Sequence, residues 1–326
     1  MILRRDVENT DAGLFRDDMP VMLMLVGLPG SGKSFVAEKM KIEYTFDCQI
    51  HSSDALRKEL FGNEEEQEYN TELFIELHRR IREDLKNGIS VIYDATNINK
   101  KKRIAFLKEL VNIPCYIECL IVATPYETCI RQNAERERVV PEDVIRRMYL
   151  AWQPPDYREG FSKISICYHE DVYTQKWQYS QYISSIENFD QENSHHTLSL
   201  GGHSDAAARY VRMMDSENPR VYTAAMLHDC GKPFTKSRLN HDGKDDGNCH
   251  YYNHQNVGAY DTVLYLARES YGVRQTVYIS NLVYYHMHPY MSWKQSEKAM
   301  KRDREFLGEQ MFSDIMLLHD ADISAH

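Results

Sequence analysis

The sequence predicts two domains: an α/β domain built on a parallel sheet with helices on both faces, followed by an all-α domain. Three observations lead to this expectation. The apolar run 21–26 is followed at once by a glycine-rich loop and by helical spacing, which is typical of a buried parallel strand and its crossover helix. Strand and helix patterns then alternate as far as residue 168. Beyond residue 190 the segments are helix-rich and hold 11 of the 14 histidines.

The composition is that of a globular chain without a membrane span. At 326 residues, the usual prior of about 100–200 residues per domain favours two domains. No apolar run approaches the roughly 18 residues of a membrane helix, and the N-terminus lacks the apolar segment of a signal peptide. The seven cysteines are scattered singly and are odd in number, which indicates reduced thiols. We therefore expect a cytoplasmic protein with no membrane contact.

The net charge of −10 limits how the chain can hold a nucleic acid. An acidic protein has no general field that attracts a polyanion, so a nucleic-acid substrate would have to be held locally, near one end. Two short basic clusters, at 79–82 and 100–103, offer local positive charge. A solvated helix face is the more common role of such clusters.

The glycine-rich loop, Gly27-Leu-Pro-Gly-Ser-Gly-Lys-Ser34, has the pattern G-x-x-x-x-G-K-S of a P-loop. Glycines let backbone N–H groups close around phosphate oxygens at the start of a helix. The lysine reaches the β- and γ-phosphates, and the serine hydroxyl holds Mg²⁺. The residues expected to contact nucleotide and magnesium here are Gly27, Pro29, Gly30, Ser31, Gly32, Lys33 and Ser34.

The elements around the loop follow in alternation. The expected strands after the first are 46–50, 89–94, 115–122 and 164–168, and the expected helices are 34–44, 65–87, 99–111, 126–138 and 142–152. This alternation is the pattern of a parallel sheet with helices on both faces. We expect the first domain to span 1–170. Residues 171–194 form a linker or the first helix of the second domain, which spans 195–326.

Polar side chains stand where two of these strands end. Asp54 follows the second strand and Asp94 closes the next, at the carboxyl edge where open α/β sheets bind ligands. Asp54 can accept a proton from an attacking hydroxyl, or it can simply cap the helix that begins at Ala55. Arg57, one turn later, can bind a phosphate through two N–H groups, or it can be an ordinary exposed surface arginine. Asp94 can orient Lys33 or a magnesium-bound water.

Three arginines follow on a charged helix, which we interpret as a lid over the phosphates. Arg131 and Arg136 are expected to close on the nucleotide and stabilise the transferred charge. For Arg138 we favour an ion-paired helix, because Glu135 and Glu137 lie between these arginines.

The second domain carries an adjacent His228-Asp229 pair at the end of an apolar helical run. Such a pair gives one metal ion a nitrogen and an oxygen ligand, and distant His and Asp side chains can complete the shell. Taken singly, the other residues have ordinary interpretations. His286 lies on a tyrosine-rich face where a core histidine is common, and Asp320 can cap a helix.

Residues 20–155 resemble the kinase domain of bacteriophage-type 5′-hydroxyl polynucleotide kinases. The stretches that match are the P-loop, Ser53-Asp54-x-x-Arg57, Asp94-Ala-Thr-Asn97 and Asn133-x-x-Arg136 with the following Val140-Pro141. The resemblance implies ATP-dependent phosphorylation of a 5′-hydroxyl nucleic-acid end. Asp54 would be the general base, Arg57 would bind the phosphate 3′ of the accepting nucleotide, and Arg136 would be the lid residue on ATP. The spacing from Arg131 to Val-Pro differs from the family by one residue, and the Asp-x-x-Arg step also occurs in kinases of small molecules.

Residues 195–326 resemble the HD superfamily of metal-dependent phosphohydrolases, and within it the HD domain of bacterial CCA-adding tRNA nucleotidyltransferases. The similarity lies in the order His, His-Asp, His, His, Asp and in His228-Asp229-x-Gly231-Lys232. It implies a first metal held by His203, His228, Asp229 and Asp320, and a second bound or supported by His254 and His286. Lys232 would contact a phosphate.

Five further residues are kept as secondary candidates for the metal shell, since spacing does not choose among them: His196, His250, His288, His319 and Asp322. A mixed histidine and carboxylate set suits Mn²⁺, Co²⁺ or Ni²⁺ better than Mg²⁺. Such a metal makes a bound water more acidic and polarises a phosphoryl oxygen.

Together the two resemblances imply an RNA end-healing enzyme. Metal-independent ribonucleases leave a 5′-hydroxyl and a 2′,3′-cyclic phosphate, which a kinase and an HD phosphoesterase would repair before an RNA ligase acts downstream. RNA ends are the expected partner, with DNA ends left open. Two alternatives remain: a small-molecule kinase fused to an HD nucleotidase, which the net charge of −10 favours, and a P-loop switch that regulates the HD hydrolase.

Overall fold

The computed structural model describes residues 2–4, 19–43, 48–62, 70–193 and 198–325, and these divide into two compact units. The first unit takes its residues from 1–148 and 155–171, and the second takes its residues from 149–154 and 172–326. No helix in the described ranges is long and apolar enough to cross a membrane.

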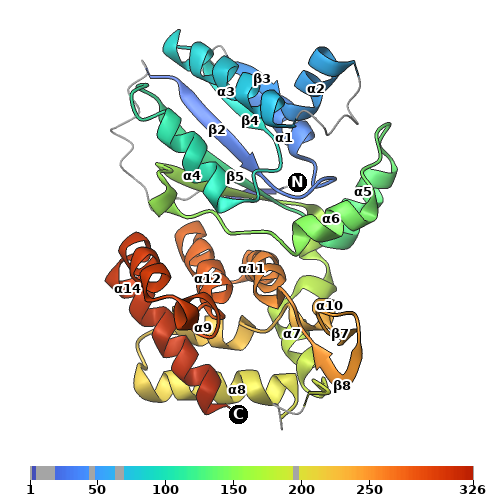
Figure 1. The fold of residues 1–326 in the computed structure, drawn as a ribbon, viewed down its shortest axis with the longest axis vertical. Helices are drawn as coiled ribbons and strands as arrows, with labels where there is room; N and C mark the ends of the chain where they lie inside the picture. The colour runs from blue at the N-terminus through green and yellow to red at the C-terminus, as the bar shows by residue number, and fades with distance from the viewer. Residues whose placement is uncertain (1, 5–18, 44–47, 63–69, 194–197, 326) are drawn as a thin grey trace. The chain divides into compact units, whose positions relative to one another are not determined.

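In the described part of the first unit, six strands form one sheet in the order β1-β6-β5-β2-β4-β3 (Figure 1). Five strands are parallel, as the sequence predicted, and β1 is added antiparallel to β6 at one edge. The strands are β1 (Ile2–Arg4), β2 (Val21–Val26), β3 (Cys48–Ser52), β4 (Ser90–Asp94), β5 (Tyr116–Ala123) and β6 (Lys163–Tyr168).

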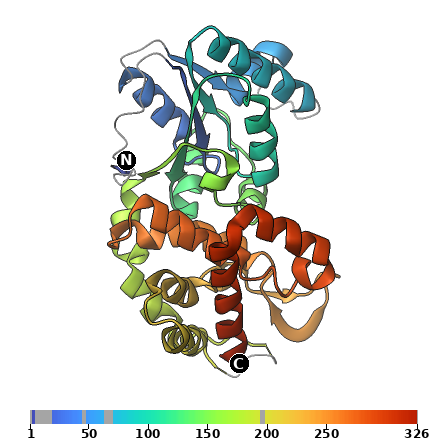
Figure 2. The same cartoon turned by 90° about the vertical axis from the view of Figure 1, so that its left-hand side faces the viewer.

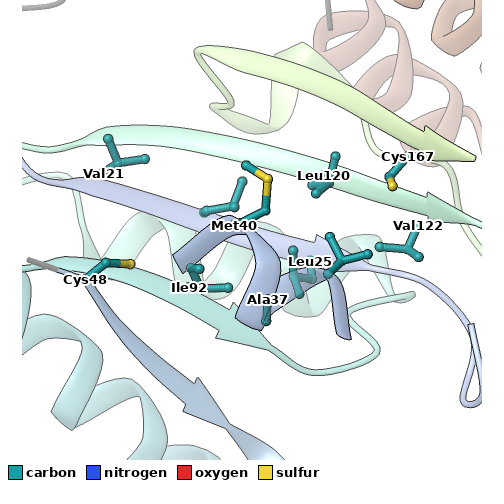
Figure 3. Packing of buried hydrophobic residues seen from close by; sticks show 11 residues of the cluster. Val21, Leu25, Ala37, Met40, Cys48, Ile92, Leu120, Val122 and Cys167 are labelled. Atoms are coloured by element: carbon teal, nitrogen blue, oxygen red, sulfur yellow. The ribbon is translucent and has the colours of Figure 1, made fainter. Parts of the chain in front are cut away.

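Strand β2 lies between β5 and β4 and is buried along its whole length. Its odd-numbered residues pack against helix α1 in one apolar cluster (Figure 3). The cluster contains Val21, Leu23, Leu25, Val36, Ala37, Met40, Cys48, Ile92, Leu120, Val122 and Cys167. The other face is covered as well, because Tyr93 of β4 makes ring contacts with His78 of α3 and Phe106 of α4. Helices therefore cover both faces, which confirms the predicted fold class.

The helices of the first unit are α1 (Lys33–Glu43), α2 (Ser53–Phe61), α3 (Asn70–Lys86), α4 (Lys100–Glu109), α5 (Tyr126–Ala134) and α6 (Glu142–Tyr149), with the 3-10 helix η1 (Tyr157–Glu159). Helix α3 buries residues at a spacing of four, which its amphipathic sequence predicts: Leu73, Leu77, Ile81 and Leu85. Arg79, Arg80 and Arg82 of the basic cluster 79–82 are ion-paired with glutamates.

Two helices end earlier than expected, for reasons that lie elsewhere in the chain. Helix α5 ends at Ala134 instead of 138, because the Asn133 side chain exchanges two hydrogen bonds with the Val140 backbone, at 3.0 and 2.8 Å. Helix α6 ends at Tyr149 instead of 152. The following residues join the second unit, where Trp152 is fully buried against Tyr260.

The second unit is helical, as predicted, with one addition: a two-stranded hairpin of β7 (Ser237–Leu239) and β8 (Asp245–His250). Its helices are α7 (Tyr179–Ile186), α8 (Leu200–Met214), α9 (Pro219–Leu227), α10 (Lys232–Thr235), α11 (His254–Tyr265), α12 (Val273–Tyr285), α13 (Ser292–Gln295) and α14 (Glu297–Ser324). Three 3-10 helices accompany them, η2 (Glu170–Tyr173), η3 (Gln175–Trp177) and η4 (Leu266–Arg268). Helix α14 bends at Gly308, where φ is 75°, and Figure 2 shows its two segments meeting at an angle. Helix α7 occupies much of the stretch expected to be a linker or first helix.

Candidate active sites

The P-loop joins β2 to α1 with glycines at its two tightest points. Gly30 and Gly32 have φ of 76° and 90°, a region that side chains other than glycine rarely adopt. A Cβ on Gly30 would lie 2.2 Å from the carbonyl oxygen of Cys129, so the loop rests directly on α5. The loop is also tied to its neighbours by hydrogen bonds from Gly27 N to Thr96 O and from Thr124 Oγ1 to Ser31 O.

Lys33 and Ser34 lie at the start of α1, where Lys33 contacts the Leu28 carbonyl and Ser34 contacts the Asp94 carboxylate. The Lys33 ammonium donates to the Leu28 carbonyl at 2.8 Å across its own loop. Burial lowers the pKa of Lys33 below its ordinary value, and the nearby Asp94 carboxylate opposes this shift. The Ser34 hydroxyl donates to Asp94 Oδ2 at 2.7 Å. Hydroxyl and carboxylate oxygens are the ligands that Mg²⁺ prefers, so this pair fits a magnesium ion.

Asp54 lies at the same sheet edge, because Ser52 at the end of β3 pairs with Asp94 at the end of β4. It does not cap α2. That role belongs to Ser52, whose hydroxyl accepts from Ala55 N, so the Asp54 carboxylate is available for other contacts. Its Oδ1 accepts from Arg57 Nη1 at 3.0 Å. Arg57 is not a bare surface residue, since it is buried and also donates to Asn70.

The lid arginines separate into two groups. Arg136 and Arg138 follow α5 and face Asp54, with Arg138 Nη1 at 2.8 Å from Oδ1 and Arg136 Nη2 at 3.7 Å from Oδ2. The ion-paired helix expected for Arg138 is thus wrong, because α5 has ended and the partner is Asp54. Arg131 is 59% exposed and donates to Asp171 at 2.6 Å. Its partner here is Asp171 and not Asp54, and its contact with ATP stays a prediction.

In the second unit, buried histidines from four separate segments converge on Asp229. His203 lies on α8, His228 follows α9, His254 begins α11 and His286 follows α12. The Nε2 atoms of His203 and His228 are 3.1 Å apart, and those of His254 and His286 are 3.2 Å apart. Asp229 lies between the two pairs, with Oδ2 3.3 Å from His228 Nε2 and Oδ1 3.3 Å from His254 Nε2.

Each of three histidines is oriented through its other ring nitrogen. The Nδ1 atoms of His228, His254 and His286 lie 2.6–2.7 Å from backbone carbonyls three residues earlier in the chain. An Nδ1–H that donates to a carbonyl leaves Nε2 as the lone-pair atom, which is the usual arrangement of metal-binding histidines. When these histidines are neutral, their lone pairs point at one another around Asp229, and such an arrangement fits metal ions held between them.

The charges of the pocket also favour a cation. Burial by itself would lower the pKa of His228, but the carboxylates of Asp229 and Asp322 outweigh it and raise this pKa to about 10. His286 is different: burial, with His254 and His228 nearby, lowers its pKa to about 3. Two groups of three residues could each hold a metal ion, with Asp229 shared: His203, His228 and Asp229, and then Asp229, His254 and His286.

The carboxylate near the end of α14 that contacts the first group is Asp322, and the expectation of Asp320 is wrong. Asp322 Oδ1 lies 3.0 Å from His203 Nε2 and 3.6 Å from His228 Nε2, and Tyr290 donates to its Oδ2 at 2.9 Å. Asp320 is exposed. Residues two apart on a helix point roughly 200° apart, so only one of them can face the pocket.

Lys232 was expected at a phosphate, and it lies beside Asp229, which both candidate ligand groups share. Its ammonium is 2.7 Å from Asp229 Oδ2 and donates at 2.7 Å to Gln191 Oε1. Gln191 is 1% exposed and its backbone carbonyl accepts from the Tyr251 hydroxyl. It belongs to the stretch expected to be a linker, where no local motif marks a functional glutamine.

The remaining secondary candidates lie outside the two ligand groups found in the described residues. His250 pairs with Asp246 on the hairpin, and the His319 ring packs against Tyr290. His288 packs against Tyr285. His196 lies outside the described residues.

Two family models match different parts of the chain. Residues 22–155 match the model of a family described as AAA domain, and residues 196–323 match the model of the HD domain. The L-seryl-tRNA(Sec) kinase of Methanococcus maripaludis is 26% identical over 183 residues, which are 53% of this chain and 68% of that protein.

Similar solved structures include two chains of the Pnkp1/Rnl/Hen1 complex and a kinase. The first, from a Pnkp1/Rnl/Hen1 RNA repair complex, is 23% identical over 42% of this chain, with a TM-score of 0.35. The second, from a Pnkp1/Rnl/Hen1 complex, is 26% identical over 38% of this chain, with a TM-score of 0.31. The match spans 45% and 41% of those chains, so this chain corresponds to less than half of each. A gluconokinase from Sinorhizobium meliloti is 16% identical, covers 46% of this chain and 83% of its own, and has a TM-score of 0.34.

Proposed function

Because the chain joins a P-loop, kinase-like AAA domain to a C-terminal HD domain, we propose that it is an RNA end-healing enzyme. Its kinase phosphorylates 5′-hydroxyl polynucleotide ends with ATP, and its HD domain hydrolyses 2′,3′-cyclic phosphate or 2′-phosphate ends. The observation that carries the proposal is that one chain holds two clusters of chemically reactive side chains. One cluster surrounds Asp54 beside a P-loop, and the other surrounds Asp229.

In the kinase, Lys33 binds the β- and γ-phosphates of ATP, while Ser34 and Asp94 hold Mg²⁺. Asp54 takes the proton of the acceptor hydroxyl as its oxygen attacks the γ-phosphorus. Arg57 holds the acceptor phosphate, and Arg136 stabilises the charge of the transferred group. All these residues belong to the first unit.

In the hydrolase, His203, His228, Asp229 and Asp322 hold the first metal, and His254 and His286 bind or support a second. A bound transition metal such as Mn²⁺, Co²⁺ or Ni²⁺ supplies Lewis-acid polarisation of the phosphate and a more acidic water. Lys232 neutralises the phosphate oxygens, and Gln191 keeps its ammonium directed at the site.

The chemistry of RNA ends explains why the two proposed activities would occur in one chain. A single cleavage leaves both a 5′-hydroxyl and a 2′,3′-cyclic phosphate, so one substrate needs both enzymes. An RNA ligase is then the partner that joins the healed ends. One relative is named as a seryl-tRNA kinase, so hydroxyl groups linked to RNA are further acceptors to test.

A small-molecule kinase fused to a nucleotidase is the second candidate. The net charge of −10 favours it, because nothing general in the chain attracts a polyanion. A P-loop switch that regulates the HD hydrolase is a third, and it predicts nucleotide-dependent hydrolysis without any phosphorylated acceptor.

The test uses an RNA oligonucleotide with a 5′-hydroxyl and a 2′,3′-cyclic phosphate, incubated with ATP, Mg²⁺ and then Mn²⁺, Co²⁺ or Ni²⁺. Mass spectrometry of both ends should show a gained 5′-phosphate and an opened cyclic end. Lys33→Ala should abolish only the first change, because the phosphate-binding ammonium is lost, and Asp229→Ala should abolish only the second. An unchanged oligonucleotide in a preparation that still consumes ATP would favour the small-molecule pair.

A further inference from the structure

One oxygen of the proposed catalytic base is shared by two guanidinium groups. Asp54 Oδ1 accepts from Arg57 Nη1 at 3.0 Å and from Arg138 Nη1 at 2.8 Å, while Arg136 approaches the opposite oxygen at 3.7 Å. Three positive charges thus surround one negative charge. The excess positive charge is what a phosphate group would neutralise.

Arg138 is held in this position by the loop that carries it. Asn133 closes the loop through its two hydrogen bonds with Val140, and a Cβ on Gly30 would lie 3.1 Å from the Asn133 Cβ. The loop is therefore anchored against the P-loop. The Arg138 side chain is 16% exposed, although the next residue, Val139, is 54% exposed. An arginine paired only with its neighbours in sequence would be expected to remain as exposed as Val139.

Arg138 and Arg57 donate to the same oxygen, Oδ1, so their guanidinium groups lie close enough for one phosphate to contact both, whereas Arg136 approaches Oδ2. Two N–H donors occupy the lone pairs of Oδ1. Oδ2 has Arg136 Nη2 at 3.7 Å, beyond hydrogen-bond distance, so Oδ2 is the oxygen that can accept the proton of a hydroxyl. The anion that reaches Arg57 in the proposed kinase reaction is the phosphate of the acceptor.

We propose that Arg138 is a specificity-determining residue, which binds the acceptor phosphate together with Arg57. The inference rests on the proposed kinase function. With the phosphate held by Arg57 and Arg138, Asp54 Oδ2 accepts the hydroxyl proton, the acceptor oxygen forms its bond to the γ-phosphorus, and the bond to the β–γ bridging oxygen breaks. The electron pair of that bond leaves with ADP. An acceptor without a phosphate next to its hydroxyl makes neither guanidinium contact, so it binds more weakly and its KM is higher.

The experiment compares a nucleoside 3′-monophosphate with the same nucleoside lacking the phosphate, as 5′-hydroxyl acceptors for the full-length protein. Acceptor KM, ATP KM and kcat are measured for wild type, Arg138→Gln, Arg138→Lys and the control Arg147→Gln. Arg147 is an exposed arginine paired with Asp143 on α6. Thermal unfolding of each variant checks that it is folded. If Arg138→Gln does not fold, Arg138→Lys is the variant to compare with wild type, because it retains the positive charge.

Wild type should prefer the phosphorylated acceptor. In Arg138→Gln the acceptor KM for the 3′-monophosphate should rise about 10- to 100-fold, the range for one lost charge-assisted hydrogen bond. ATP KM and the rate with the nucleoside should change less than about twofold. Arg138→Lys should lie between wild type and Arg138→Gln, and Arg147→Gln should match wild type.

Three results would overturn the inference while leaving the kinase assignment intact. They are a rise in ATP KM with acceptor KM unchanged, an equal loss with both acceptors, and an equal loss in Arg147→Gln. A wild-type protein that consumes ATP but phosphorylates neither acceptor nor a 5′-hydroxyl oligonucleotide would instead overturn the proposed function, and the inference with it.

Discussion

At the residue scale, the two aspartates near the end of α14 give a matched pair of variants. Asp322 contacts His203 and His228, whereas Asp320 is exposed. Asp322→Asn should lower metal affinity at least about 10-fold, because one charged ligand is lost and the Tyr290 hydroxyl loses its carboxylate partner. Asp320→Asn should leave it unchanged. Metal content after dialysis, measured by atomic spectroscopy, distinguishes them.

The kinase provides an internal control for that pair of substitutions. Both variants should phosphorylate a 5′-hydroxyl acceptor at the wild-type rate, since α14 belongs to the second unit. Equal metal loss in Asp320→Asn would contradict the assignment of Asp322 as the ligand.

Residue identities could be predicted wherever a short motif carries the chemistry. The P-loop and the His228-Asp229 pair are local patterns, and the structure places their side chains in two buried sites. Arg138 and Gln191 could not be found in this way, because their partners are distant in sequence and no local pattern links them. Asp322 had a usable signal: it follows the buried Leu318 by four residues, whereas Asp320 does not share that helix face.

At the element scale, a buried ion pair connects α4 to η1 and supports the strand end beside the P-loop. Arg103 Nε and Nη2 donate to the two oxygens of Glu159 at 2.7 and 2.6 Å, and Nη1 donates to the carbonyl of Asn97 at 2.9 Å. Both ionic side chains are almost fully buried. Asn97 in turn donates to Leu25 at the end of β2, so the pair fixes the loop that follows β4.

Arg103→Met should destabilise the protein by about 3–5 kcal/mol, because it leaves the Glu159 carboxylate buried without its partner. Arg103→Met combined with Glu159→Leu should recover most of this loss, since the unpaired charge is gone. Denaturant unfolding measures the free energy of unfolding in both variants. A single variant that costs less than about 1 kcal/mol, or a double variant no better than the single one, would show that the pair does not support the fold in this way.

Periodicity was sufficient to predict which elements exist, while their ends depended on contacts made elsewhere. The buried run of β2 and the spacing of four in α3 are visible in the sequence because burial repeats along one face. The end of α5 depends on the Asn133 side chain closing back onto Val140, and β3 continues past the expected Ile50 to Ser52, which pairs with Asp94 of β4. The hairpin β7–β8 lacks alternating apolar residues, so its polar sequence gave no strand signal.

At the scale of the whole molecule, the two chemistries use separate sets of residues. Lys33, Ser34, Asp54 and Asp94 all belong to the first unit, and the ligands around Asp229 all belong to the second. Ligands that bind only the folded form stabilise it by mass action, by about 2.7 kcal/mol at 100 times the dissociation constant. For a unit of this size that is a shift of roughly 5–10 °C in the unfolding midpoint.

We expect calorimetry of the full chain to resolve two transitions that respond to different ligands. ATP with Mg²⁺ should raise one midpoint, and this shift should vanish in Lys33→Ala, because the ammonium that binds the phosphates is gone. Mn²⁺ after chelator treatment should raise the other midpoint, and that shift should vanish in Asp229→Ala, because both ligand groups share this carboxylate. Each variant should keep the shift of the unaltered unit. The contrary result would be a single transition whose midpoint rises with either ligand. If either substitution then abolished the response to both ligands, the two sites would unfold as one cooperative unit, and end healing would proceed through a coupled enzyme.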